Sequence, residues 1–210
     1  MKIQPADVLD VRFIQQDTEL DCGAAAFEMV YRFLRPSKLS KFDRKKFFAR
    51  YRKSDPHVRD SLRIDTDDLV AAGLNRGLKS RLCVAFPTEE GMVNMFKGLL
   101  YNDRVPIIVC QRLSDEMALC GHFRVVIGCT DTEVIFHDPL GGNSVRWPVS
   151  QFFDYFKRTG ENVAGGICVI ISKDDITTPV YYDQGPWIVM SKKLDKFSRI
   201  APVQDMVDPS

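Results

Sequence analysis

The sequence predicts a single α+β domain in which helices come first and an antiparallel sheet follows. Helical spacing of apolar residues dominates from residue 22 to about residue 101, whereas short β-type apolar runs dominate from residue 105 to residue 172. The chain has 210 residues, of which 45% are hydrophobic, and this is enough to bury one sizeable core. No internal repeat or low-complexity tract interrupts this order.

Three helices and one strand are expected in the first half, after an extended lead-in. Asp21 is the predicted N-cap of the first helix, and Pro36 lies just past its end. Thr66 is expected to cap the second helix and Thr88 to open the third, each before two acidic residues. The predicted ranges are 8–16 for the lead-in, 22–33, 67–76 and 88–101 for the helices, and 78–85 for the strand.

Residues 38–63 form a basic insertion between the first two helices, with ten lysines and arginines against three aspartates. Phe42, Phe47, Phe48 and Tyr51 recur at helical spacing, so a basic amphipathic helix is expected, with its aromatic face on the core. The alternative is a surface for an acidic partner. Nucleic acid is not the favoured partner, because local charge is its only support.

The second half is expected to be mainly β, with strands over residues 105–111, 122–128, 133–137, 144–147 and 167–172 and a helix over 150–157. The domain predicted over residues 1–172 is followed by a C-terminal extension, residues 173–210. This extension carries four prolines and no long periodic run. We expect it to dock along the domain or to be partly disordered.

Composition narrows the class of protein. A net charge of +1 and a pI of about 7.6 give no general attraction to nucleic acid or membranes. The first residues contain no apolar stretch of the secretory type, and the longest apolar runs are too short to span a bilayer. We therefore expect a soluble, cytoplasmic protein. Six cysteines occur without any Cys-x-x-Cys pair, which favours reduced thiols.

Cys22, His122 and Asp138 offer the chemistry of a cysteine acyl-transfer enzyme. Cys22 lies in an Asp-Cys-Gly motif that opens an apolar helix, and a helix N-terminus favours the thiolate. His122, at the head of an apolar strand, is the expected general base, and this position is expected to leave it exposed enough to meet the thiol. Asp138, which follows 16 positions later, is expected to orient it from the neighbouring strand.

Other residues fit these roles less well. Cys120 shares strand parity with His122, but it has no helix N-terminus behind it and no amide donor before it. His137 is expected to point to the opposite face from Asp138. A zinc site built from His57, His122, His137 and the cysteines would lack any ligand pair at a standard spacing. We therefore expect no metal and no cofactor.

The order Gln-Cys-His-Asp, with Gln16 six positions before Cys22, resembles that of papain-like cysteine peptidases. Within that group it is similar to the bacteriocin-processing peptidases that cut after a double-glycine leader and are usually fused to ABC exporters. The resemblance rests on residues 16–29 and 121–142, and more weakly on 106–108. It implies a papain-like fold. It also implies that the amide of Gln16, rather than that of Gln15, donates to the oxyanion beside the Cys22 N–H.

We therefore expect a stand-alone cysteine peptidase that acts on a peptide or protein substrate. The resemblance implies cleavage after a Gly-Gly-type site, although the basic insertion, the extension and the lack of exporter segments depart from that family. Two alternatives stay open. One is a papain-like acyltransferase or deamidase that acts as a toxin or effector, because the same thioester chemistry serves these reactions. The other is a catalytically idle module that binds a peptide.

Overall fold

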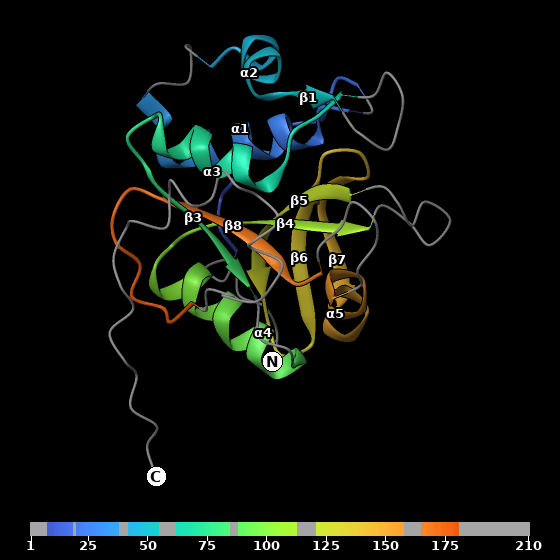
Figure 1. Cartoon of the computed structure of the whole chain (residues 1–210). Helices are drawn as coiled ribbons and strands as arrows, with labels where there is room; N and C mark the ends of the chain where they lie inside the picture. Colours follow the sequence, from blue (N-terminus) through green and yellow to red (C-terminus); the bar gives the residue numbers. More distant parts are fainter. Residues whose placement is uncertain are drawn as a thin grey trace.

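An antiparallel sheet of six strands is the frame of the molecule, shown in Figure 1 as a computed structural model. The strand order is β3-β8-β4-β5-β6-β7, and every pairing is antiparallel. The strands span Lys79–Val84 (β3), Ile107–Arg112 (β4), Gly121–Cys129 (β5), Glu133–Asp138 (β6), Gly142–Pro148 (β7) and Ile167–Ser172 (β8). The structure describes residues 8–18, 20–37, 42–54, 62–84, 88–112, 121–157 and 165–180.

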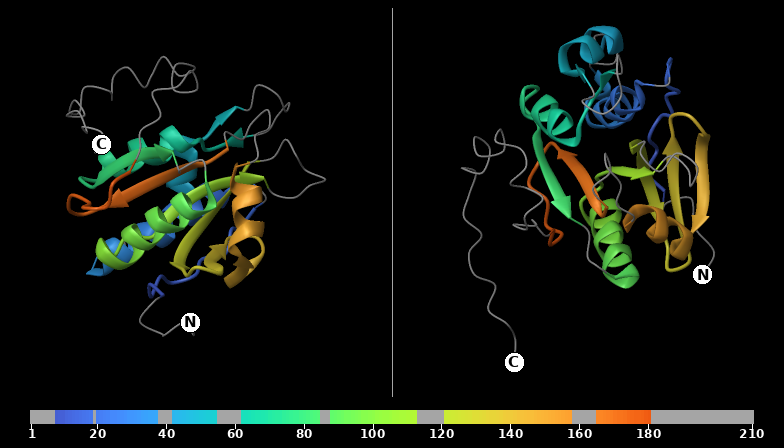
Figure 2. Two further views of the ribbon diagram at one scale, coloured as in Figure 1. Left: turned by 90° about the horizontal axis from the view of Figure 1, so that it is seen from below. Right: turned by 45° about the vertical axis from the view of Figure 1, so that its right-hand side comes forward.

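Helices cover both faces of this sheet. In Figure 1, α1, α2 and α3 lie above the sheet while α4 and α5 lie below it, and the right-hand view of Figure 2 shows the same division. The helices span Cys22–Leu34 (α1), Arg44–Tyr51 (α2), Thr66–Leu74 (α3), Glu89–Lys97 (α4) and Val149–Lys157 (α5), and α4 continues into a π-helical turn, Gly98–Asn102 (η3). The predicted α+β class is confirmed.

The helices on both faces of the sheet explain why its central strands are almost entirely apolar. In β5 the eight residues from His122 to Cys129 are all buried, so apolar side chains do not alternate with polar ones as they would in a strand with one wet face. Polar residues inside this strand are therefore exceptions, and His122 and Arg124 both belong to the site described below.

The helix α1 packs against β5 through small residues. Ala24, Ala25 and Ala26 are fully buried, and a Cβ on Gly23 would lie 3.1 Å from the ring of Phe123. Because small side chains allow a close approach, the N-terminal end of α1 reaches the strand that carries His122. The space beside Gly23 is filled by Phe123.

The basic insertion contains the expected amphipathic helix, α2. Its Phe47 and Tyr51 are buried, and Phe47 stacks on Phe27 of α1 with ring centroids 4.7 Å apart. The guanidinium of Arg76 lies 5.0–5.9 Å from the centroids of five rings of this cluster. A two-stranded ladder that the sequence did not predict, β1 (Lys53–Ser54) with β2 (Leu62–Arg63), follows α2. The rest of the insertion, 38–41 and 55–61, lies outside the described residues.

The start of α3 differs from prediction, and the predicted N-cap of α1 lacks its capping bond. The N-cap of α3 is Asp65 rather than Thr66, because Asp65 and Asp68 form a reciprocal capping box. Asp21 does occupy the N-cap of α1, but its carboxylate makes no capping bond to the helix. It accepts instead from the preceding loop, where Thr18 N donates to Oδ1 over 2.8 Å.

The beginning of the C-terminal extension docks on the domain, and the extension after residue 180 lies outside the described residues. Asp103 accepts hydrogen bonds from the backbone N–H groups of Thr177 (2.7 Å) and Thr178 (3.0 Å). None of the helices in the described ranges combines the length and the apolarity that a membrane span requires.

Candidate active site

Cys22 is the first residue of α1 and is 9% exposed. The loop before it is held by the Asp21 carboxylate, which accepts from the backbone N–H groups of Asp17 (3.2 Å) and Thr18 (2.8 Å). No disulfide joins the five cysteines that the structure describes, whereas Cys120 lies outside the described residues. The thiol of Cys22 is therefore not consumed in a disulfide.

His122 and Asp138 form a direct pair. His122 is the second residue of β5 and Asp138 the last of β6, and His122 Nε2 lies 2.6 Å from Asp138 Oδ1. The Cys22 side chain lies close enough to the imidazole to interact with it. His122 is only 3% exposed, which is less than we expected for the start of a strand, but it still meets the thiol. The three side chains predicted for the triad are thus brought together.

The Asp138 carboxylate has a full set of partners. Besides His122, its Oδ1 accepts from the N–H groups of Leu140 (2.9 Å) and Gly141 (3.0 Å), and its Oδ2 accepts from Arg124 Nε (2.8 Å). A Cβ on Gly141 would lie 3.1 Å from the Asp138 carboxylate, so the turn wraps it closely. The carboxylate is thereby fixed in both position and orientation.

Arg124 and Gln111 extend this pair into a buried network that the sequence interpretation missed. Arg124 Nη1 donates to Gln111 Oε1 (3.2 Å), and Gln111 Nε2 donates to the carbonyl of Phe152 in α5 (3.3 Å). The Arg124 guanidinium also lies 5.2 Å from the ring centroid of Trp147. Strand parity was an available signal, because Arg124 is two residues after His122 in an otherwise apolar run and therefore shares its face.

These contacts set the charges of the pair. Burial by itself lowers the pKa of His122, but hydrogen bonds with Asp138 and Cys22 and attraction to both groups outweigh it, so the pKa of His122 is raised above its ordinary value. Burial by itself raises the pKa of Asp138. The His122 hydrogen bond and the charges of His122 and Arg124 outweigh that effect, so the pKa of Asp138 lies well below its usual range. The pair favours an imidazolium next to a carboxylate.

Gln16 lies in the loop that leads to Cys22. Its backbone N–H donates to the carbonyl of Pro139 (3.1 Å), the residue after Asp138, and its side-chain Nε2 donates to the carbonyl of Thr18 (2.8 Å). A primary amide carries two N–H groups. The bond to Thr18 uses one of them, so the other N–H of Gln16 Nε2 can still donate. Gln16 is thus tied to the turn that holds Asp138.

His137, the other histidine of this region, has a separate role. Its Nε2 donates to the carbonyl of Val11 (2.7 Å) and its Nδ1 accepts from Ser144 N–H (3.2 Å). It joins the N-terminal lead-in to β6 and β7. It is not part of the Asp138 network, in agreement with the expected face. His57 lies outside the described residues.

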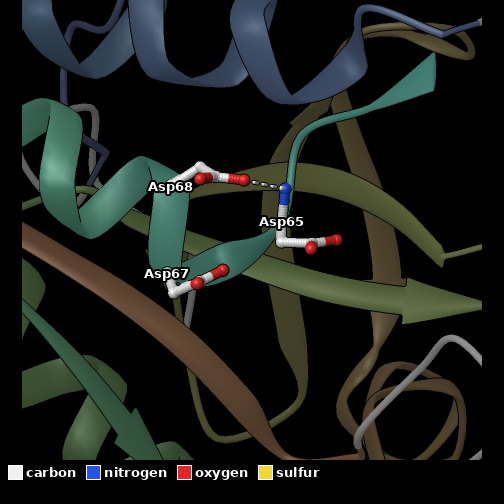
Figure 3. Close-up of side chains that lie close together, drawn as sticks. All are labelled: Asp65, Asp67 and Asp68. Atoms are coloured by element: carbon white, nitrogen blue, oxygen red, sulfur yellow. Dashed lines mark hydrogen bonds between the residues drawn. The ribbon is translucent and has the colours of Figure 1, made fainter. Parts of the chain in front are cut away.

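One cluster of possible metal ligands occurs in the part of the chain that the structure describes. Asp65, Asp67 and Asp68 bring carboxylate oxygens within 4.8 Å of one another at the start of α3 (Figure 3). The backbone N–H of Asp65 donates to Asp68 (3.2 Å), as the capping box requires. The capping interaction accounts for this arrangement, and it provides no evidence for a cation.

Comparisons with known proteins agree with this geometry. The family model described as "Papain-like cysteine protease AvrRpt2" matches residues 5–157. Comparison with curated proteins finds no match.

Three solved structures are similar to this chain in fold. Their sequence identities to it are low, so the similarity concerns the fold alone. A putative C39-like peptidase from Bacillus anthracis has a TM-score of 0.56 at 18% identity, over 80% of this chain and 98% of that one. A double glycine motif protease from an AMS/PCAT transporter, solved in complex with the leader peptide, has a TM-score of 0.54 at 20% identity, over 80% and 94%. The peptidase domain of Streptococcus ComA has a TM-score of 0.54 at 18% identity, over 77% and 97%.

Proposed function

We propose a catalytic triad for this chain, which belongs to the papain-like cysteine protease family of AvrRpt2. In this proposal the peptidase cleaves its substrate through Cys22, His122 and Asp138, with Gln16 as the oxyanion donor. The observation that carries the proposal is the buried pair of His122 Nε2 and Asp138 Oδ1, 2.6 Å apart, with the Cys22 side chain next to the same imidazole. A pairing of this kind is what thiol catalysis requires.

In the acylation step the Cys22 thiol transfers its proton to His122 Nδ1, the ring nitrogen that does not face Asp138. The sulfur attacks the substrate carbonyl, and the carbonyl electron pair moves to oxygen. In our proposal the Cys22 N–H and the Gln16 side-chain amide donate hydrogen bonds to that oxyanion and stabilise it. The C–N bond then breaks, His122 gives its proton to the leaving amine, and a thioester on Cys22 remains.

In the deacylation step His122 takes a proton from water, whose oxygen attacks the thioester. The C–S bond breaks, and the proton returns to the Cys22 sulfur. Asp138 stays ionised throughout, because a low pKa keeps its charge whichever form His122 adopts. The same residues therefore serve both halves of the cycle.

For the substrate we propose a peptide or protein with a Gly-Gly-type site. The support is fold likeness to a protease named for its double glycine motif and solved with a leader peptide. We also propose an acidic segment in the substrate or in a partner that meets the insertion. Lys45, Lys46 and Arg50 lie exposed on α2 and support this choice.

The first test is the rate at which iodoacetamide alkylates Cys22 as a function of pH, read by intact mass and peptide mapping, in wild type and His122→Ala. We expect fast labelling at Cys22 below pH 7 that is lost in the variant, because the imidazole accepts the thiol proton. Burial raises the pKa of Cys129 to about 12, which makes this cysteine an internal control that stays unlabelled.

A peptide ending in Gly-Gly-aminomethylcoumarin tests the reaction itself. Release of the coumarin by wild type but not by Cys22→Ala would support the peptidase. Slow labelling that is spread over several cysteines, at the same rate in wild type and His122→Ala, would contradict the triad. Fast labelling of Cys22 together with a product that carries a new amide bond and no cleaved fragment would indicate acyl transfer instead.

A further inference from the structure

The loop that carries Gln16 is crowded with negative charge. Asp17 and Asp21 lie in or next to this loop, and Glu28 lies one and a half turns into α1 with its side chain only 7% exposed. Arg32 pairs with Glu28 at 2.5 Å, one helical turn further on. Carboxylates held this close together repel one another unless a cation lies among them.

Arg44, the first residue of α2, supplies that cation. Its Nη1 donates to the carbonyl of Gln15 (2.5 Å), and its Nη2 lies 2.6 Å from Asp17 Oδ1. Its Nε lies 3.8 Å from Asp21 Oδ2 and 3.7 Å from Glu28 Oε2. The Arg44 side chain is 15% exposed, and those of Asp21 and Glu28 are 8% and 7% exposed, so water screens these two contacts less than it would at the surface. The Asp17 side chain, in contrast, is 55% exposed.

We infer that Arg44 is a positioning residue for the oxyanion donor, an inference that rests on the proposed function of Gln16. The carbonyl of Gln15 belongs to the peptide unit whose N–H is that of Gln16. A hydrogen bond to that carbonyl therefore fixes the plane from which the Gln16 side chain departs. The other end of the loop is fixed by Asp21, which Arg44 also contacts. Through Arg44, the basic insertion therefore holds both ends of the loop that carries Gln16.

The helix α2, which carries Arg44, is itself fixed to the domain. Phe42 and Phe47 contact Phe27 of α1, with ring centroids 6.0 Å and 4.7 Å apart, and Tyr51 packs on Phe47 within α2. Arg44 is therefore presented by a helix whose position does not depend on the loop. A guanidinium suits this task better than an ammonium group, because its planar fork can hold a carbonyl and a carboxylate at the same time.

The experiment compares Arg44→Ala and Arg44→Lys with Arg146→Ala, which removes an exposed arginine of β7 that pairs with Glu133, in wild-type and Gln16→Ala backgrounds. The probe is acetyl-Gly-Gly p-nitrophenyl ester, whose nitrophenolate burst reports acylation of Cys22 even if the chain does not cleave amides. Alkylation by iodoacetamide is measured in parallel, because that reaction builds no oxyanion.

We expect Arg44→Ala to slow the burst about 10- to 100-fold, within the range that follows loss or displacement of one oxyanion donor. Alkylation of Cys22 should stay within about twofold of wild type, Arg44→Lys should recover only part of the burst rate, and Arg146→Ala should match wild type. In the Gln16→Ala background Arg44→Ala should have little further effect, because the two changes remove the same interaction.

Equal losses in both backgrounds, or a parallel loss of alkylation, would overturn the inference, since Arg44 would then support the fold in general rather than Gln16. A normal burst in Arg44→Ala would overturn it as well. A wild-type chain that shows the burst but releases no coumarin from the amide probe would contradict the proposed peptidase function alone. A wild-type chain without any burst would contradict both.

Discussion

At the scale of single residues, the site depends on how the Asp138 carboxylate is held. In the proposed catalytic cycle the charge of His122 changes, so a carboxylate paired with His122 alone would lose its cation in one half of that cycle. Arg124 is a permanent cation 2.8 Å from the other oxygen of the same carboxylate. It keeps Asp138 ionised in both halves, and its own burial is compensated by Gln111 and the ring of Trp147.

His137 and His122 give the protein opposite dependences on pH. Burial lowers the pKa of His137, so its contribution to stability is complete above the unfolded value of 6.5 and is lost as the pH falls below it. The pKa of His122 is raised, so its contribution is complete below 6.5 and is lost as the pH rises through the folded value. Acid therefore acts on the fold through the structural histidine.

We expect His137→Gln to flatten the loss of stability between pH 7.5 and pH 5.5. Protonation of His137 at Nδ1 would break the bond from Ser144 N–H, and glutamine does not titrate in this range. One proton accounts for a slope of at most about 1.4 kcal/mol per pH unit in the free energy of unfolding. Urea denaturation at three pH values measures this slope, and His122→Gln is the control that should change it on the alkaline side. An unchanged acid slope in His137→Gln would show that other groups cause it.

The three residues of the proposed triad could be singled out in the sequence because each lies in its own local motif. Cys22 begins a helix, His122 heads a strand, and Asp138 precedes a Pro-Leu-Gly-Gly turn. Arg44 was not predicted, because its contact with the Gln15 carbonyl joins positions 29 residues apart and depends on how the insertion folds back. Charge in the sequence identified the insertion as basic, but only the tertiary structure distinguishes Arg44 from the exposed lysines beside it.

At the scale of elements, the contact between α1 and β5 brings Cys22 to His122, the proposed nucleophile and base. This contact passes through Gly23, where an added Cβ would lie 3.1 Å from Phe123 Cδ2 and 3.4 Å from Ile64 Cβ. Phe123 is next to His122 in the chain, so a change in this contact displaces Cys22 and His122 relative to each other. Helix propensity favours alanine over glycine by about 1 kcal/mol, whereas overpacking costs about 1–3 kcal/mol.

We therefore expect Gly23→Ala to leave stability within about 2 kcal/mol of wild type while the alkylation rate of Cys22 falls roughly tenfold, because catalysis is more sensitive to small displacements than folding is. Phe123→Leu, added to Gly23→Ala, should restore much of the rate by making room for the new methyl group. Alkylation at the wild-type rate in Gly23→Ala would show that the helix can move aside without separating the pair.

Element types were easier to predict than element ends. The periodicity of residues 22–33 and 150–157 predicted α1 and α5 closely. The π-helical turn η3, in contrast, was predicted as a plain continuation of α4. This region meets the extension, since a Cβ on Gly98 would lie only 2.5 Å from Thr178. Sequence windows do not contain that partner, which comes from a segment about 80 residues away.

At the scale of the whole molecule, stability and catalysis are supported at opposite ends of α1. Cys22 begins the helix, whereas Phe33 and Leu34 at its other end line a pocket together with Asp103 and Ile176, where the extension docks. Thirteen residues of helix separate these ends by about 20 Å at 1.5 Å per residue. A change at the docking site should therefore alter the free energy of unfolding and leave the thiol untouched.

Asp103→Ala tests this separation. Asp103 accepts from Thr177 N (2.7 Å), Thr177 Oγ1 (2.7 Å) and Thr178 N (3.0 Å), so its removal leaves the partly buried turn of the extension without its acceptor. We expect the free energy of unfolding to fall by about 1–3 kcal/mol, as for other hydrogen bonds to a charged group. Lys79→Ala, which removes the exposed ion pair with Asp175, should cost less than about 1 kcal/mol. Urea denaturation measures both losses, and iodoacetamide labelling of Cys22 should match wild type in both variants. If labelling slows in Asp103→Ala, the docking site is coupled to the active site along α1, and the two ends do not act independently.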